Sequence, residues 1–203
     1  MEILLVRHGE VHNPQQVYYG RLPNFRLSDN GRRQAQAAAE ALSDVPLDAL
    51  FSSPQPRAQE TAGFITARKP QLTLQTHHLL NEVYSPWDGT AHSVMEQRSY
   101  DLYTDSPSPY EQPADIVRRA REFMAWARRE HSGERIAAVT HGDVIAFTIL
   151  WAKGVPLHHS ERHFQRFDFP DQYPATASIT TLTFNSSDVT EVPQVAYLRP
   201  YEA

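Results

Sequence analysis

The chain contains no cysteine. A disulfide framework, a thiolate nucleophile and a cysteine-bound metal or cluster are therefore excluded. The chain also lacks an apolar run long enough to cross a bilayer, and its first two residues lead directly into a strand-like run. Because this leaves no room for a signal peptide or a membrane span, we expect a cytoplasmic protein without a membrane partner.

An excess of basic residues is also missing. Lysine and arginine together number 19 against 24 aspartates and glutamates, and the formal net charge is -5. We therefore expect no nucleic-acid partner, and any anion site must be local. With 203 residues, 40% of them hydrophobic, and no repeat, linker or low-complexity tract, the sequence predicts a single domain over residues 1–203. Its oligomeric state stays open.

The first candidate site lies at the beginning of the chain. Residues 3–6 are apolar and favour a buried strand, and they run directly into Arg7, His8, Gly9 and Glu10. In open α/β sheets, ligands bind just beyond the carboxyl ends of the strands. A strand that delivers Arg7 and His8 at that edge is a candidate site, although the same residues also suit the start of a solvated loop.

The pattern of a strand, a polar turn and a helix recurs along the chain. A strand over 47–51 precedes a helix that starts at Pro56 beside Arg57, and a strand over 136–140 precedes His141 and a helix over 144–152. Glu82 follows a strand over 72–76. Further helices are expected after an N-cap at Ser28 and over 92–103 and 114–130, and further strands over 164–169, 178–184 and 195–198.

These elements bring Arg7, His8, Arg57, Glu82 and His141 toward one edge of the expected sheet. Two arginines and two imidazoles that converge on one pocket form an anion site, and the planar guanidinium matches the oxygens of a phosphoryl group. Helix N-termini at the same edge add backbone N–H donors. Phosphate chemistry suits such a pocket.

Four motifs in this order resemble the histidine phosphatase superfamily, in its phosphoglycerate mutase-like branch. They are Leu-Leu-Val-Arg-His-Gly-Glu at 4–10, Ser-Ser-Pro-Gln-Pro-Arg-Ala-Gln-Glu-Thr-Ala at 52–62, Asn-Glu at 81–82 and Val-Thr-His-Gly at 139–142. The resemblance implies an α/β fold, a three-layer α/β/α sandwich with a mostly parallel central sheet. By the same resemblance, we expect the protein to need no cofactor.

The resemblance also assigns roles to residues. His8 is the nucleophile, Glu82 protonates the leaving oxygen, and the phosphoryl group is held by Arg7, Arg57, His141 and Asn13. The assignments suit the chemistry, because the arginines disfavour protonation of His8 and keep it nucleophilic. A dianionic substrate should favour protonation of both His141 and Glu82.

The sequence departs from the family pattern at three places. Residues 83–89 replace a common Gly-x-Trp-Glu-Gly run, residues 10–13 differ from the frequent Glu-Thr-x-x-Asn, and Asp143 stands where a second glycine is common. For the outer pocket we expect the segment 84–113 together with Tyr18, Tyr19, Arg21, Tyr84 and Trp87. The irregular, proline-rich segment 84–113 is a candidate lid, although a plain surface excursion fits it equally.

No metal site is predicted. The remaining histidines suit surface positions, and adjacent histidines on a strand point to opposite faces, so neither His77–His78 nor His158–His159 is a natural pair of ligands. The expected function is metal-independent hydrolysis of a small phosphorylated metabolite through a phosphohistidine intermediate. Two alternatives are a cofactor-dependent mutase and a non-catalytic module that binds phosphoproteins. The sequence leaves the natural substrate open.

Overall fold

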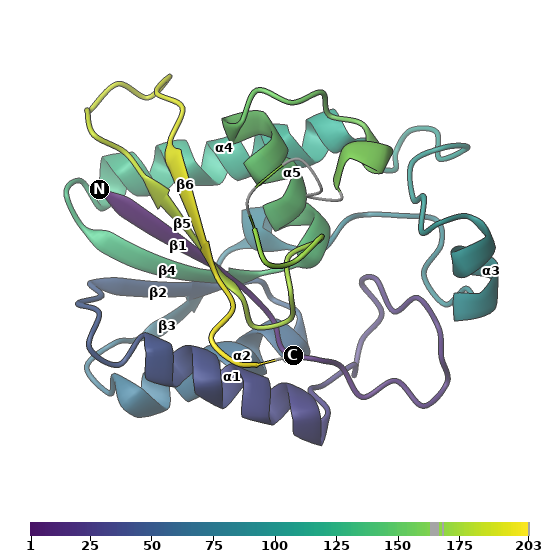
Figure 1. The fold of residues 1–203 in the computed structure, drawn as a ribbon, viewed down its shortest axis with the longest axis horizontal. Helices are drawn as coiled ribbons and strands as arrows, with labels where there is room; N and C mark the ends of the chain where they lie inside the picture. Colours follow the sequence, from purple (N-terminus) through teal and green to yellow (C-terminus); the bar gives the residue numbers. More distant parts are fainter. Residues whose placement is uncertain (163–166, 168, 203) are drawn as a thin grey trace.

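The computed structural model describes residues 1–162, 167 and 169–202, and its fold is drawn in Figure 1. The helices are α1 (Asp29–Ala41), α2 (Pro56–Arg68), α3 (His92–Gln97), α4 (Pro113–Glu130) and α5 (Gly142–Ala152), with short 3-10 turns η1 (His78–Leu80) and η2 (His159–Arg162). The strands are β1 (Glu2–Arg7), β2 (Ala49–Ser52), β3 (Leu74–Thr76), β4 (Arg135–Thr140), β5 (Ile179–Thr183) and β6 (Gln194–Leu198).

Within the described part of the chain, the strands form one sheet in the order β3-β2-β4-β1-β5-β6. The pairs β3–β2, β2–β4 and β4–β1 are parallel, whereas β5 is antiparallel to both β1 and β6. The prediction of an α/β fold with a mostly parallel sheet is confirmed. The two antiparallel pairs lie at one side of the sheet, where β5 and β6 extend it beyond β1.

Helices cover both faces of the sheet, with α1 and α2 on one side and α4 and α5 on the other (Figure 1). Alternation along each strand explains the two cores. In β1, Ile3 and Leu5 pack with residues of α4 and α5, whereas Leu4 and Val6 pack with residues of α1 and α2. Because both faces of β1 are covered, its four central residues are all buried, as the apolar run predicts.

Local signals account for several helix starts. Ser28 caps α1 by accepting a hydrogen bond from the Gly31 N–H at 2.9 Å, as predicted. Pro56 occupies the first turn of α2.

The helix predicted over 92–103 ends at Gln97, because Ser99 and Tyr100 adopt positive φ values of 51° and 53°. The strand expected over 164–169 falls largely outside the described residues.

The segment 84–113 packs against the body of the protein. Its residues Met95, Leu102 and Tyr103 are buried and form a third core cluster with residues of α4 and α5. Backbone hydrogen bonds also join it to the loop before α1, including Tyr18 N–H to Thr90 O at 2.7 Å. A role as a moving lid stays a prediction. Among the described helices, none is long and apolar enough to cross a membrane.

Candidate active site

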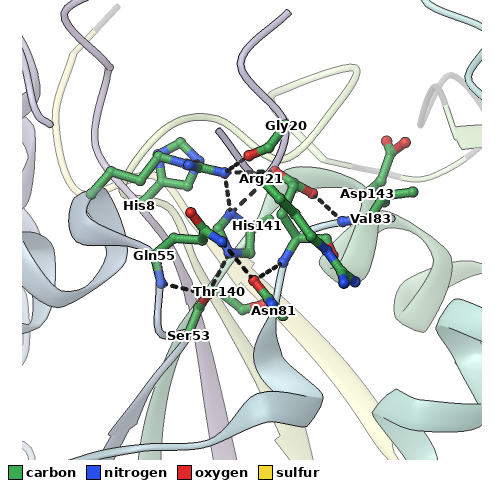
Figure 2. Close-up of polar contacts among 12 residues, drawn as sticks. His8, Gly20, Arg21, Ser53, Gln55, Asn81, Val83, Thr140, His141 and Asp143 are labelled. Carbon is green, nitrogen blue, oxygen red and sulfur yellow. Dashed lines mark hydrogen bonds and ion pairs between the residues drawn. The ribbon is translucent and has the colours of Figure 1, made fainter. Parts of the chain in front are cut away.

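The predicted site residues meet at the carboxyl edge of the parallel strands. Arg7 ends β1 and is paired with Thr140, which ends β4, so His8 and His141 follow neighbouring strands. Their ring centroids lie 5.2 Å apart. Figure 2 shows the two rings among the polar contacts of the site. Arg57 enters from the first turn of α2, and Glu82 from the loop after η1.

His8 is buried and has a defined tautomer. Its Nδ1 lies 2.7 Å from the Gly9 carbonyl oxygen, which only accepts, so Nδ1 carries the proton. Its Nε2 accepts a hydrogen bond from Arg57 Nε at 3.2 Å. Burial lowers the pKa of His8 well below its usual value, and the charges of Arg57, His141 and Arg7 lower it further. His8 is therefore neutral, with its Nε2 lone pair directed at the guanidinium.

Arg57 is the centre of the cluster and is 0% exposed. Its Nη2 donates to the Gly20 carbonyl at 2.8 Å and to Glu82 Oε2 at 3.2 Å, and its guanidinium carbon lies 4.8 Å from the centre of the Tyr19 ring. Arg57 Nη1 and Arg7 Nε are buried and have no hydrogen-bond partner among the described residues. Buried cationic donors of this kind favour an anionic ligand.

His141 lies between Ser53 and Glu82. Its Nε2 is 2.8 Å from Ser53 Oγ, and its Nδ1 is 3.1 Å from Glu82 Oε2. Burial lowers the pKa of His141 to about 4; Glu82 opposes this shift and Arg57 adds to it. In the protein as described, His141 is therefore neutral near pH 7. Its predicted protonation requires the negative charge of a substrate.

Glu82 is an anion in this structure. Burial raises its pKa, but the nearby His141 and Arg57 and the hydrogen bond from the Val83 N–H outweigh burial and hold the pKa well below its usual range. Protonation of Glu82 is predicted for the site with a bound phosphoryl dianion, and it stays a prediction. A phosphoryl dianion bound to Arg57 would favour this protonation in two ways. It would withdraw the Arg57 guanidinium from Glu82, and it would place a second negative charge beside the carboxylate.

Three ligand-type atoms also come together here. Among the described residues, His8, Glu82 and His141 offer atoms that lie within 4.8 Å of one another, a spacing that suits a metal ion. However, the Arg57 guanidinium contacts all three side chains. A divalent cation at this place would meet that positive charge at short range, so the cluster is better suited to an anion.

The other predicted residues are distributed differently. The amide of Asn13 is held by the backbone of Val17, to which it donates at 2.8 Å and from which it accepts at 3.3 Å. Asn13 does not belong to the residues found to line the cavity, so its role in phosphate binding stays a prediction. Tyr19 lines the cavity.

The remaining residues of the predicted outer pocket do not line that cavity. Arg21 donates to the Glu82 carbonyl at 2.8 Å and pairs with Glu111. Tyr84 is 40% exposed and lies over the Arg21 guanidinium. Trp87 donates from Nε1 to Ser106 Oγ at 3.1 Å.

The cavity at the site has a volume of about 390 Å³. As predicted, Tyr18 and residues of the segment 84–113 line it, namely His92, Ser99, Tyr100 and Leu102. The sequence did not assign four further lining residues to the pocket: Gly142, Asp143, Arg162 and Tyr173. Asp143 carried a signal, because it departs from the family pattern. Gly142 belongs to the motif at 139–142, whereas no periodicity or motif marks Arg162 or Tyr173 as facing a pocket.

Comparisons with known proteins agree with this geometry. A family model described as the histidine phosphatase superfamily (branch 1) matches residues 3–192. The uncharacterized protein Rv0525 of Mycobacterium tuberculosis is 34% identical over 200 residues, which cover 94% of each chain. Phosphoserine phosphatase 1 of Hydrogenobacter thermophilus is 29% identical over 150 residues, covering 70% of this chain and 71% of that protein.

The solved structures agree on the fold. YhfR of Bacillus stearothermophilus superposes with a TM-score of 0.79 at 24% sequence identity, over 96% of this chain and 95% of that one. The family model also spans the four motifs that carry His8, Arg57, Glu82 and His141. The chain therefore belongs to branch 1 of the histidine phosphatase superfamily and is an enzyme of the phosphatase class.

Proposed function

We propose that the enzyme hydrolyses a small phosphomonoester without a metal, through a phosphohistidine formed on His8. The observation that carries the proposal is the tautomer of His8. Because the protonated Nδ1 donates to the Gly9 carbonyl, the Nε2 lone pair faces Arg57, where a phosphoryl group would be held. The low pKa of His8 keeps that lone pair available at neutral pH.

The proposed reaction has two steps. In the first, Nε2 of His8 attacks phosphorus, the bond to the ester oxygen breaks, and the protonated Glu82 gives its proton to the leaving alkoxide. In the second, the Glu82 carboxylate takes a proton from water as the water oxygen attacks phosphorus. The phosphorus–nitrogen bond breaks and phosphate leaves with His8 restored. Arg7, Arg57 and His141 neutralise the phosphoryl oxygens throughout.

The main alternative is a mutase that returns the phosphoryl group to a second position of a sugar acid. As judged from the resemblance, mutases carry a longer insertion with more basic residues between the positions of Glu82 and His141. Here most arginines of that stretch belong to α4, and none of them lines the cavity. The relative named a phosphoserine phosphatase also favours hydrolysis. Phosphate release from an aryl phosphate, compared with interconversion of 2- and 3-phosphoglycerate, separates the two reactions.

A non-catalytic phosphoprotein-binding module is the second alternative. Binding alone needs cations and hydrogen-bond donors, which Arg7, Arg57 and His141 provide. It does not need an oriented neutral imidazole beside a carboxylate. The arrangement of His8 and Glu82 therefore favours catalysis.

The variant His8→Ala tests the proposal. It should lower kcat by about a thousandfold or more, because no other group takes the phosphoryl, while phosphate binding is partly retained. Acid-labile, base-stable phosphorylation of a quenched reaction should disappear with it. The control is His12→Ala, since His12 is exposed and the substitution removes an imidazole outside the cavity. Unchanged turnover in His8→Ala would overturn the mechanism.

A further inference from the structure

Beyond the phosphoryl end, the cavity wall is rich in rings. Tyr18 and Tyr19 stack with their centroids 6.5 Å apart and their planes 8° from parallel. His92 and Tyr100 meet edge to face at 6.1 Å, and Leu102 lies beside them on the wall. Tyr18 and Tyr19 are held as neutral phenols, since burial raises the pKa of each. Such a wall offers apolar and aromatic contact area.

The His92 ring in this wall is an acceptor toward its neighbour. The Asn13 amide is oriented by Val17, because its oxygen must face the Val17 N–H and its nitrogen the Val17 carbonyl. The Asn13 nitrogen therefore donates to His92 Nε2, at 3.4 Å. His92 thus adds a ring to the wall, with its Nε2 directed at the Asn13 amide.

Charged groups on this wall are already paired with each other. Arg162 Nη1 lies 3.0 and 3.3 Å from the two Asp143 oxygens, and both side chains are 6% exposed. Arg162 Nη2 donates to the backbone carbonyls of Ser99 and Tyr100, at 3.2 and 2.8 Å. The Asp143 oxygens also accept from the hydroxyls of Tyr103 and Tyr173, each at 2.6 Å.

The charges of Asp143 and Arg162 therefore compensate each other, and their hydrogen bonds go to groups of the protein. Apart from the groups at the phosphoryl end, the described lining residues leave no unpaired cation for a carboxylate and no unpaired anion for an ammonium group. A charged substituent that meets these described residues would lose water and gain no opposite charge. A ring would gain contact area instead.

We propose that the enzyme selects phosphate esters of uncharged, ring-bearing alcohols over esters that carry a carboxylate or an ammonium group, and that the Asp143–Arg162 pair sets this choice. The inference rests on the proposed function and names the substrate class for the same site. It also separates this chain from the relative named a phosphoserine phosphatase, because phosphoserine carries both charged groups.

A panel of alkyl phosphates tests the preference without bias from the leaving group. Benzyl and 2-phenylethyl phosphate are compared with O-phosphoserine and 3-phosphoglycerate, and ethyl phosphate is the common reference. All five esters have alkyl leaving oxygens. We expect kcat/KM for the two ring-bearing esters to exceed that for the two charged esters by about tenfold or more. Equal or higher values for the charged esters would overturn the inference while leaving the proposed function intact.

Absence of phosphate release from every ester, ethyl phosphate included, would instead contradict the proposed function, and the inference would fall with it.

The variant Asp143→Asn tests the role of the pair. It keeps the side-chain shape but leaves Arg162 with an uncompensated charge, so the preference for benzyl phosphate over 3-phosphoglycerate should shrink by about fivefold or more. The double variant Asp143→Asn, Arg162→Gln removes both charges and should restore the preference of the unmodified enzyme. This second variant also answers the case in which Asp143→Asn does not fold, because it leaves no unpaired buried charge.

The matched control is Asp105→Asn. Asp105 is exposed and has a φ of 60°, a conformation that asparagine tolerates well, so this change alters the net charge equally without touching the wall. A preference that shifts as much in Asp105→Asn as in Asp143→Asn, or one that the double variant fails to restore, would overturn the role of the pair.

Discussion

His141 is fully buried beside Ser53 and Glu82, and burial lowers its pKa to about 4. Burial and the neighbouring cations lower the pKa of His8 in the same direction. Both imidazoles are thus neutral where an exposed histidine begins to take up a proton. Neutral His8 is what nucleophilic attack requires, and the same burial makes the stability of the fold depend on pH.

Acidification should therefore destabilise the protein. Between the unfolded pKa near 6.5 and the folded pKa of about 4, the unfolded chain binds a proton that the folded His141 does not, so the free energy of unfolding falls as the pH falls. The slope is about 1.4 kcal/mol per pH unit for one such group. Urea unfolding from about pH 7 to about pH 5 should show this trend. This range of pH is chosen because Glu82 of the unfolded chain takes up its proton at lower pH.

The matched variants are His141→Gln and His78→Gln. The first should make the dependence on pH shallower, whereas the second should not, because His78 is exposed. Identical slopes in His141→Gln and the unmodified protein would contradict the assignment of the pH dependence to this buried imidazole.

The cluster of His8, Glu82 and His141 makes metal independence a sharp prediction. Dialysis against a chelator should leave the rate of phosphate release unchanged, and an added divalent ion should not raise the melting temperature, since Arg57 supplies the positive charge that a metal would bring. Activity that is lost on dialysis and returns with a divalent ion would show that the trio holds a metal.

The end of β1 and the start of α1 come together through two glycines. A Cβ on Gly9 would lie 2.3 Å from the Gly31 carbonyl oxygen, and a Cβ on Gly31 would lie 1.9 Å from the Glu10 carbonyl oxygen. Backbone therefore packs directly on backbone where the chain leaves His8. This close approach holds the nucleophile at its place beside α1, and neither neighbour is a flexible side chain that could move away.

Gly31→Ala should lower the free energy of unfolding by about 1–3 kcal/mol, because the backbone must shift to admit the methyl group. Gly63→Ala in α2 is the control. No atom lies within 4 Å of a Cβ built there, so alanine should instead stabilise the helix by about 0.5–1 kcal/mol. Urea unfolding of both variants measures the difference. Equal stability of Gly31→Ala and the unmodified protein would show that the contact relaxes freely.

Two of the three core clusters share side chains. Trp151 packs against the cluster between α4, α5 and the sheet, and also against the cluster that includes the segment 84–113. Trp126 packs against the first of these clusters, and Trp87 against the second. Shared packing of this kind predicts that the segment unfolds together with the sheet, as expected for a single domain.

Two variants with a single tryptophan test this. Trp126→Phe with Trp151→Phe leaves Trp87 as the reporter in the segment, and Trp87→Phe with Trp151→Phe leaves Trp126 as the reporter of the main core. In each variant, the fluorescence transition in urea should coincide with the far-UV circular dichroism transition. A Trp87 transition at lower urea than its own dichroism transition would show that the segment opens as a separate unit.

Sequence patterns alone were sufficient to predict the sheet, most helices and the meeting of His8, Arg57, Glu82 and His141 at one edge of the sheet. The reason is local: apolar runs predict buried strands, Ser28 and Pro56 mark helix starts, and the four motifs follow strand ends or helix starts that the parallel topology brings together. The missed boundary of α3 was decided by the positive φ values of Ser99 and Tyr100, which no periodicity records.

Tertiary structure alone decided the charge state and the outer wall of the site. The ionised Glu82 depends on Arg57 and His141, which are distant in sequence and meet it only in the fold. The pairing of Asp143 with Arg162 and Tyr173 likewise joins residues that are distant in sequence and meet only in the fold. Burial and pairing are properties of three-dimensional neighbours, so a sequence can supply the chemical groups but not their protonation states or the surface that they present to a substrate.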